Sequence, residues 1–214
     1  MTREELPIGL DIPVSLEPRR AELESAVRAA VARIATFAQA HGWGDLAREP
    51  LFDSVRIFDD KAAFDAFLIA ATGVDQDTKL PAEFCAALEN RVLTAVSPEM
   101  YEEVYAAGRE PGSYAKLLAH EIAHRLHIRI LNGDEEAMGP VWFYEGFAIY
   151  AADQMNDPTF ILSDEELWRI VANPNRGSYK KYGAAIRQFL EKTTIEEMVK
   201  RAGKDGFKEW LHGL

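Results

Sequence analysis

The residues with the clearest chemical potential are His120 and His124, which occur in the order His-Glu-x-x-His. On an α-helix, residues four positions apart project from the same face, with Cβ atoms roughly 5–6 Å apart. That separation lets one neutral ring nitrogen from each histidine reach a single Zn²⁺ at about 2.0–2.1 Å. Glu121 lies about 100° around the helix from His120, so it can flank the metal and accept a proton from a metal-activated water. The spacing therefore predicts a zinc site with Glu121 as its general base.

A third protein ligand is expected, because catalytic zinc sites commonly use three protein ligands and one water. His127 lies two helical turns beyond His120, too far along the helix axis to share its ion, so we expect it to support the site or pack in the core. Glu145 is the better candidate, since it is a lone acid in the apolar segment 141–148. A buried carboxylate needs a cation, and a metal would supply one. The alternatives are exposure at a helix end or a structural salt bridge to an arginine such as Arg125 or Arg187.

These two segments together resemble the gluzincin metallopeptidases, the clan that includes thermolysin and the zinc aminopeptidases. The second segment, Trp142 to Ala148, has the pattern W-x-x-E-G-x-A, which is especially similar to the aminopeptidase branch and its small peptidase-like relatives. The resemblance covers about residues 114–190. It implies that Glu145 is the third zinc ligand, on a helix packed against the histidine helix, and that the protein hydrolyses peptide bonds.

The resemblance also implies a tyrosine at the start of a later helix, whose hydroxyl stabilises the oxyanion formed during hydrolysis. Tyr179 and Tyr182 lie one helical turn apart in such a position, and a phenol directed at developing negative charge suits this role. Either could be the donor and Tyr179 is preferred, with packing at a helix start as the alternative. By the same resemblance, a strand over 91–96 is the edge that pairs with an extended substrate, unless neighbouring strands cover it.

One feature of the full aminopeptidases has no counterpart in this chain. Their G-x-M-E-N type segment, which binds the free amine of the substrate, is not found before His120. Exopeptidase activity is therefore not expected from the resemblance.

The elements that must position these residues follow from the hydrophobic pattern. Apolar residues at helical spacing predict helices over 18–42, 61–71, 98–105, 113–131 and 140–154, with shorter ones at 164–172, 179–192, 195–202 and 206–212. Alternating and β-branched residues predict strands over 51–58 and 91–96. Cys85, the single cysteine, is expected to be buried on a helix.

This order of elements predicts an α+β fold. It would have a small mixed sheet in the N-terminal half and a mainly helical C-terminal half, and the resemblance to gluzincins implies a zincin-like active-site helix. We expect one zincin-like domain over residues 1–214, with a strand-and-helix subdomain over 1–110 and a helical metal-binding subdomain over 111–214.

Composition and charge argue against several classes of function. The formal net charge is -11, which disfavours binding to nucleic acid or to an anionic membrane surface. No stretch approaches the roughly 20 apolar residues that span a bilayer. The first eleven residues lack the basic start and apolar run of a secretory signal, and a single cysteine excludes an internal disulfide. We therefore expect a cytoplasmic protein.

The sequence favours a metallopeptidase that binds one Zn²⁺ and acts on a peptide or protein substrate. One alternative is a metal-binding domain of the same fold whose catalysis is lost or restricted to one partner. Another is hydrolysis of a different bond by the same zinc machinery. The last, from a different class, is a non-catalytic helical interaction module.

Overall fold

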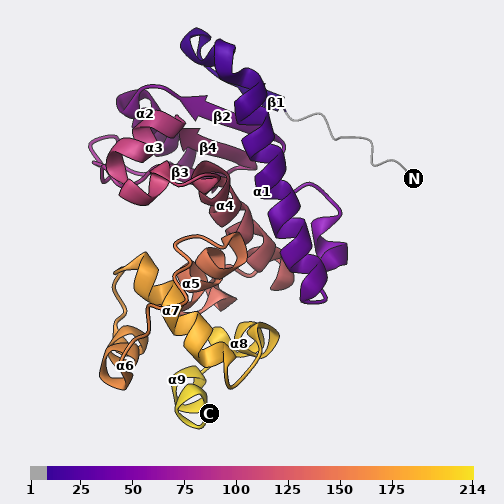
Figure 1. Cartoon of the computed structure of the whole chain (residues 1–214), viewed down its shortest axis with the longest axis vertical. Helices are drawn as coiled ribbons and strands as arrows, with labels where there is room; N and C mark the ends of the chain where they lie inside the picture. The colour runs from indigo at the N-terminus through magenta and orange to yellow at the C-terminus, as the bar shows by residue number, and fades with distance from the viewer. Residues whose placement is uncertain (1–8) are drawn as a thin grey trace. The chain divides into compact units, whose positions relative to one another are not determined.

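A four-stranded mixed sheet in the N-terminal half and a mainly helical C-terminal half make up the predicted α+β fold (Figure 1). The structure, a computed structural model, describes residues 9–214. The predicted absence of a secretory signal concerns the first eleven residues, most of which lie outside the described residues. Within 9–214, no helix is both long enough and apolar enough to cross a lipid bilayer.

The chain divides into two compact units. The described part of the first comprises residues 9–31 and 50–122, and the second comprises 32–49 and 123–214. Two long helices, α1 (Arg20–Ala40) and α4 (Ser113–Ile130), each contribute residues to both units. The organisation as a single domain with a subdomain boundary near residue 110 stays a prediction.

The sheet belongs to the first unit, and its strand order is β1-β2-β4-β3. β1, β2 and β4 are parallel, whereas β3 is antiparallel to β4. The predicted strands over 51–58 and 91–96 are confirmed as β2 and β4, while the sequence pattern predicts neither β1 nor β3. The strands are β1 (Gly9–Asp11), β2 (Ser54–Phe58), β3 (Ala86–Glu89) and β4 (Val92–Val96). Helix α2 (Lys61–Thr72) packs on this sheet and buries Phe64 and Leu68.

The prediction that residues 91–96 form the substrate-binding edge of the sheet is wrong. β4 is hydrogen-bonded to β2 on one side and to β3 on the other, so the edges within the described residues are β1 and β3. The cause is a tight hairpin, whose two-residue turn consists of Asn90 and Arg91 with φ values of 48° and 63°. Such turns match the twist of paired strands. The hairpin folds β3 back along β4 and covers its main-chain groups.

Cys85 is buried, as predicted, but the expected helix around it is wrong. The residue immediately precedes β3, and its carbonyl oxygen accepts a hydrogen bond from the backbone nitrogen of Val96 at 2.9 Å. Burial raises the pKa of the Cys85 thiol to about 11. Because the thiolate is the reactive form of cysteine, this side chain acts as a packed apolar group.

In the second unit, α5 (Val141–Ala152) and α7 (Tyr179–Leu190) approach each other closely. Glycines at the crossing allow this: a Cβ on Gly146 would lie 2.7 Å from Cγ1 of Ile186, and a Cβ on Gly183 would lie 2.7 Å from Cγ2 of Ile149. Such distances are far below van der Waals contact between carbon atoms, which is about 3.5–4.0 Å. Gly146 is thus required by packing, and it sets the position of the preceding residue, Glu145, relative to α7.

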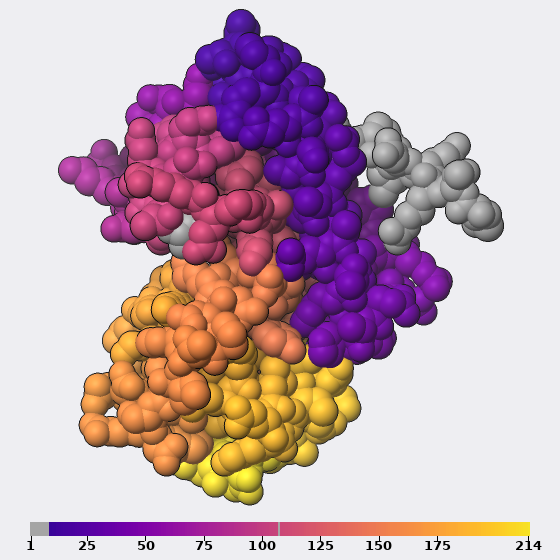
Figure 2. All heavy atoms as spheres, viewed as in Figure 1, coloured from indigo at the N-terminus to yellow at the C-terminus, as the bar shows by residue number. Residues whose placement is uncertain are grey.

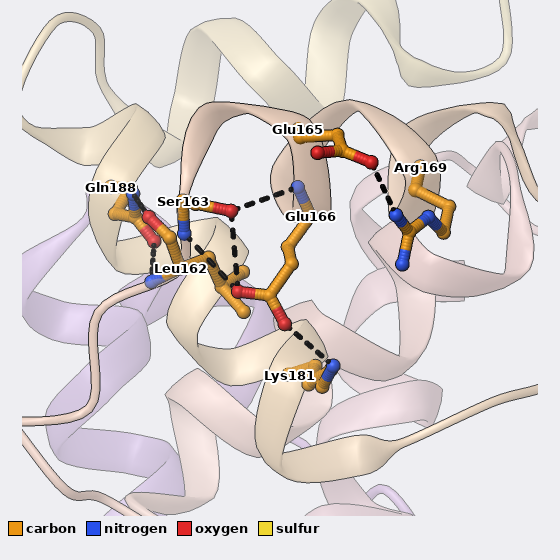
Figure 3. Close-up of polar contacts among 7 residues, drawn as sticks. All are labelled: Leu162, Ser163, Glu165, Glu166, Arg169, Lys181 and Gln188. Atoms are coloured by element: carbon orange, nitrogen blue, oxygen red, sulfur yellow. Dashed lines mark hydrogen bonds and ion pairs between the residues drawn. The ribbon is translucent and has the colours of Figure 1, made fainter.

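Polar contacts join α6 (Asp164–Ala172) to α7 (Figure 3). Ser163 and Glu166 form a capping box at the start of α6, and Lys181 pairs with Glu166 at 3.0 Å. The amide of Gln188 accepts a hydrogen bond from the backbone nitrogen of Leu162 and donates one to its carbonyl oxygen, at 2.9 and 3.1 Å. These contacts join the start of α6, and the residue before its N-cap, to α7.

The remaining helices complete the two units. They are α3 (Pro98–Val104) in the first unit and α8 (Ile195–Ala202) and α9 (Phe207–His212) in the second. The predicted helices are confirmed with ends shifted by a few residues. In the space-filling view, the orange segment after α5 and the yellow C-terminal helices pack together as one body in the second unit (Figure 2).

Candidate metal centre

Helix α4 positions the two histidines of the His-Glu-x-x-His run. Its buried apolar residues recur at helical spacing and include Leu118, Ile122 and Leu126, each no more than 1% exposed. The helix ends before Gly133, whose positive φ and hydrogen bond from its nitrogen to the carbonyl oxygen of Ile128 form a common helix stop. Because α4 is continuous through the motif, His120 and His124 lie on one face, as predicted.

Helix α5 carries Glu145 within a row of buried apolar residues. Its neighbours Trp142, Phe143, Gly146 and Phe147 are all buried, and Glu145 itself is only 2% exposed. An isolated ionised carboxylate in such surroundings is strongly unfavourable, so its position demands cationic partners. The structure therefore excludes the alternative that Glu145 is exposed at a helix end.

The structure brings His120, His124 and Glu145 together. One ligand atom from each lies within 4.8 Å of the other two. His124 and Glu145 belong to the second unit, and α4 itself carries His120, one turn earlier. The Nε2 atom of His124 lies 3.5 Å from Oε2 of Glu145. Two ligands of a tetrahedral zinc ion, each about 2.0–2.1 Å from the metal, are about 3.3–3.4 Å apart. The donor atoms thus fit a divalent metal with nitrogen and oxygen ligands.

The second carboxylate oxygen of Glu145 faces an arginine. Its Oε1 atom lies 2.7 Å from Nη1 of Arg176, in the loop between α6 and α7. Burial opposes the charge on Arg176, but Glu145 and Tyr179 outweigh it, so the pKa of Arg176 lies above its usual value. Glu145 therefore forms a salt bridge with Arg176 through Oε1, while Oε2 is the oxygen that lies near His124.

The arginine partner is a different residue from those that the sequence suggests. Arg125 pairs with Glu135 at 3.6 Å, and Arg187 donates a hydrogen bond to the carbonyl oxygen of Asp157 at 2.8 Å. Arg176 has no sequence signal that links it to Glu145, because it lies in a loop without periodicity. The aromatic ring of Tyr144, one residue before Glu145, also reaches the site and lies 5.9 Å from the ring of His124.

The two candidate oxyanion donors have different surroundings. Tyr179 is partly exposed, and its hydroxyl oxygen accepts a hydrogen bond from Nη1 of Arg176. Tyr182 is 3% exposed, and its hydroxyl is 3.4 Å from the carbonyl oxygen of Asn175, to which it donates. Burial raises the pKa of Tyr182. The Tyr182 hydroxyl is thus bonded to the loop, whereas the Tyr179 hydroxyl and Glu145 both contact Nη1 of Arg176.

His127 does not join the metal-compatible group, and its ring is packed in the second unit. It is completely buried, stacked on Phe147 with ring centroids 4.4 Å apart and edge-on to Phe143. Neither ring nitrogen has a hydrogen-bond partner among the described residues. Burial, and to a lesser degree His124, lower the pKa of His127 to about 3. The ring is therefore neutral at physiological pH and serves as part of the core.

Glu121 lies on α4 immediately after His120 and is partly exposed. It is outside the group of three potential ligands. A carboxylate beside a metal site, in contact with solvent and not needed as a ligand, is suited to proton transfer. Its role as the general base stays a prediction.

Comparison of the chain with protein-family models, curated proteins and solved structures finds no match. The likeness to gluzincins therefore rests on the motif residues and on the convergence of the three donor atoms.

Proposed function

We propose that this protein is a zinc-dependent hydrolase that cleaves peptide bonds, with His120, His124 and Glu145 as the metal ligands. The observation that carries the proposal is the group of three donor atoms within 4.8 Å of one another. Two imidazoles and one carboxylate are a ligand set found in catalytic zinc sites, which keep a further position for water or substrate. We assign zinc because a His-Glu-x-x-His run on a helix with a separate glutamate ligand is a ligand pattern of zinc hydrolases.

The helix that holds the histidines also supplies a group for proton transfer. When bound, zinc would act as a Lewis acid that polarises the scissile carbonyl and makes water a stronger nucleophile at neutral pH. Glu121 would take a proton from the attacking water as its oxygen bonds to the carbonyl carbon. The same carboxyl group would then give that proton to the amine nitrogen as the carbon–nitrogen bond breaks.

A hydrogen-bond donor for the developing oxyanion completes the proposed mechanism. We assign this role to Tyr179, because its hydroxyl is beside the arginine that contacts Glu145, while the Tyr182 hydroxyl is bonded to a loop carbonyl. A fixed donor directed at charge that develops in the transition state lowers the barrier without stabilising the ground state equally. The substrate would be a peptide or an unfolded protein segment.

Removing the metal is expected to abolish peptide hydrolysis, and adding zinc is expected to restore it. The measurement is the release of peptides from casein, an unstructured protein, before and after treatment with a chelator. Adding magnesium is the control and should restore nothing, since magnesium prefers all-oxygen, octahedral sites. Hydrolysis that continues at the same rate after the metal has been removed, as verified by elemental analysis, would rule out the proposed mechanism.

A further inference from the structure

We propose that Arg176 is a positioning residue for the metal site, which holds Glu145 so that one carboxylate oxygen, Oε2, is presented to the metal. The inference rests on the proposed metal site and adds a residue to it. Arg176 contacts one oxygen of Glu145 at 2.7 Å, and the other oxygen lies 3.5 Å from the ligand atom Nε2 of His124. The two oxygens thus face different partners.

Because its two oxygens have different partners, Glu145 is limited in how it can bind a metal. A glutamate side chain has several rotatable bonds, and a carboxylate can bind a metal through one or both oxygens. An ion pair between Arg176 and Oε1 at 2.7 Å restricts rotation of the carboxylate and favours binding through Oε2 alone. Residues that orient a metal ligand in this way typically contribute about 10–100-fold to metal affinity.

The loop that carries Arg176 is held in place by α7. The buried hydroxyl of Tyr182 donates to the carbonyl oxygen of Asn175, the residue before Arg176. The same hydroxyl lies so close to Gly177 that a Cβ there would be 3.0 Å from it. The backbone on both sides of Arg176 therefore lies against one buried tyrosine, and the ion pair of Lys181 with Glu166 joins the start of α7 to the first turn of α6 (Figure 3).

Arg176 also connects the metal ligand to the candidate oxyanion donor. Its Nη1 atom contacts both Oε1 of Glu145 and the hydroxyl oxygen of Tyr179. A single guanidinium nitrogen therefore sets the relative positions of a ligand from α5 and a phenol from α7. Because one nitrogen makes both contacts, the ammonium group of a lysine could reproduce much of the arrangement.

The test compares the zinc affinity of wild type, Arg176→Gln and Arg176→Lys by competition with a chromophoric chelator. Arg176→Gln is expected to weaken zinc binding about tenfold, and Arg176→Lys to recover most of that loss. Arg169→Gln is the matched control, because Arg169 on α6 pairs only with the exposed Glu165 among the contacts described and should leave the affinity unchanged. Thermal unfolding of each metal-free variant checks that it is folded.

A second readout is the visible spectrum of the cobalt-substituted proteins. Binding of Glu145 through both oxygens in Arg176→Gln would raise the coordination number and weaken the absorption relative to wild type. Unchanged or tighter zinc binding by Arg176→Gln would overturn the inference, since Arg176 would then be only a counter-ion that competes with the metal. Failure of the wild type to bind zinc would instead overturn the proposed metal site, and the inference with it.

Discussion

Replacing Glu121 with glutamine is expected to leave zinc binding unchanged and to reduce kcat for casein hydrolysis by about 10²–10⁴-fold. Glutamine has nearly the same shape as glutamate, but its amide cannot accept a proton from the attacking water. Because Glu121 is outside the group of donor atoms formed by His120, His124 and Glu145, the metal should be retained. The loss would therefore appear in turnover, with zinc content as an internal check.

A matched control for this variant is Glu165→Gln. Glu165 is on α6 in an exposed pair with Arg169, so its replacement should leave turnover as in wild type. The result that would contradict the proposed mechanism is a Glu121→Gln protein that retains zinc and cleaves casein at the wild-type rate. Loss of zinc from Glu121→Gln would contradict the assignment in a different way, because it would make Glu121 part of the metal-binding group.

Replacing Glu145 with alanine is expected to weaken zinc binding by at least about tenfold. The variant removes the only carboxylate in the group of three donor atoms, and it leaves two imidazoles to hold the ion. The measurement is the zinc dissociation constant, determined by competition with a chelator of known affinity. The half-exposed guanidinium of Arg176, which loses its carboxylate partner, can turn to solvent.

His127→Phe is the control for the ligand assignment. His127 is the third histidine of α4, but its ring is stacked on Phe147 and lies outside the donor group. A phenylalanine keeps an aromatic ring of similar size in this position and should leave zinc affinity near that of wild type. Equal zinc affinity of Glu145→Ala and wild type, or a comparable loss in His127→Phe, would show that the ligand set is wrong.

The parts of the fold that the sequence predicts are those in which local pattern and tertiary packing agree. The apolar residues of α4 recur at helical spacing and are buried along one face, so the relation between His120 and His124 follows from periodicity alone. β2 is predicted for the same reason, because Val55 and Ile57 alternate with more exposed residues.

The elements that the sequence does not predict depend on their neighbours. β1 has only three residues, too few to display an alternating pattern. β3 contains two alanines, a leucine and a glutamate, which favour helix over strand, and its conformation is imposed by pairing with β4 through the Asn90–Arg91 turn. This override also explains why Cys85 lies beside a strand, and why β4 is an inner strand of the sheet.

Within the candidate site, the residues farther along the chain from the two histidines are harder to predict from the sequence. The two histidines are four residues apart, so helix geometry relates them directly. Glu145 is on another helix, and only its isolation among apolar residues and a family resemblance indicate its place. Arg176 lies in a loop, and its proximity to Glu145 results from the close packing of α5 on α7 at Gly146 and Gly183. No local pattern could have indicated that contact.

The central claim, that His120, His124 and Glu145 bind a metal, is tested most directly by the metal content of the purified protein. The protein is exchanged into buffer with a small excess of zinc, freed of unbound metal by gel filtration, and examined by elemental analysis. The account predicts about one zinc per chain in the wild type and near-complete loss when both histidines are replaced by alanine. A folded wild-type protein that retains far less than one zinc per chain, or as little as the double variant, would contradict it.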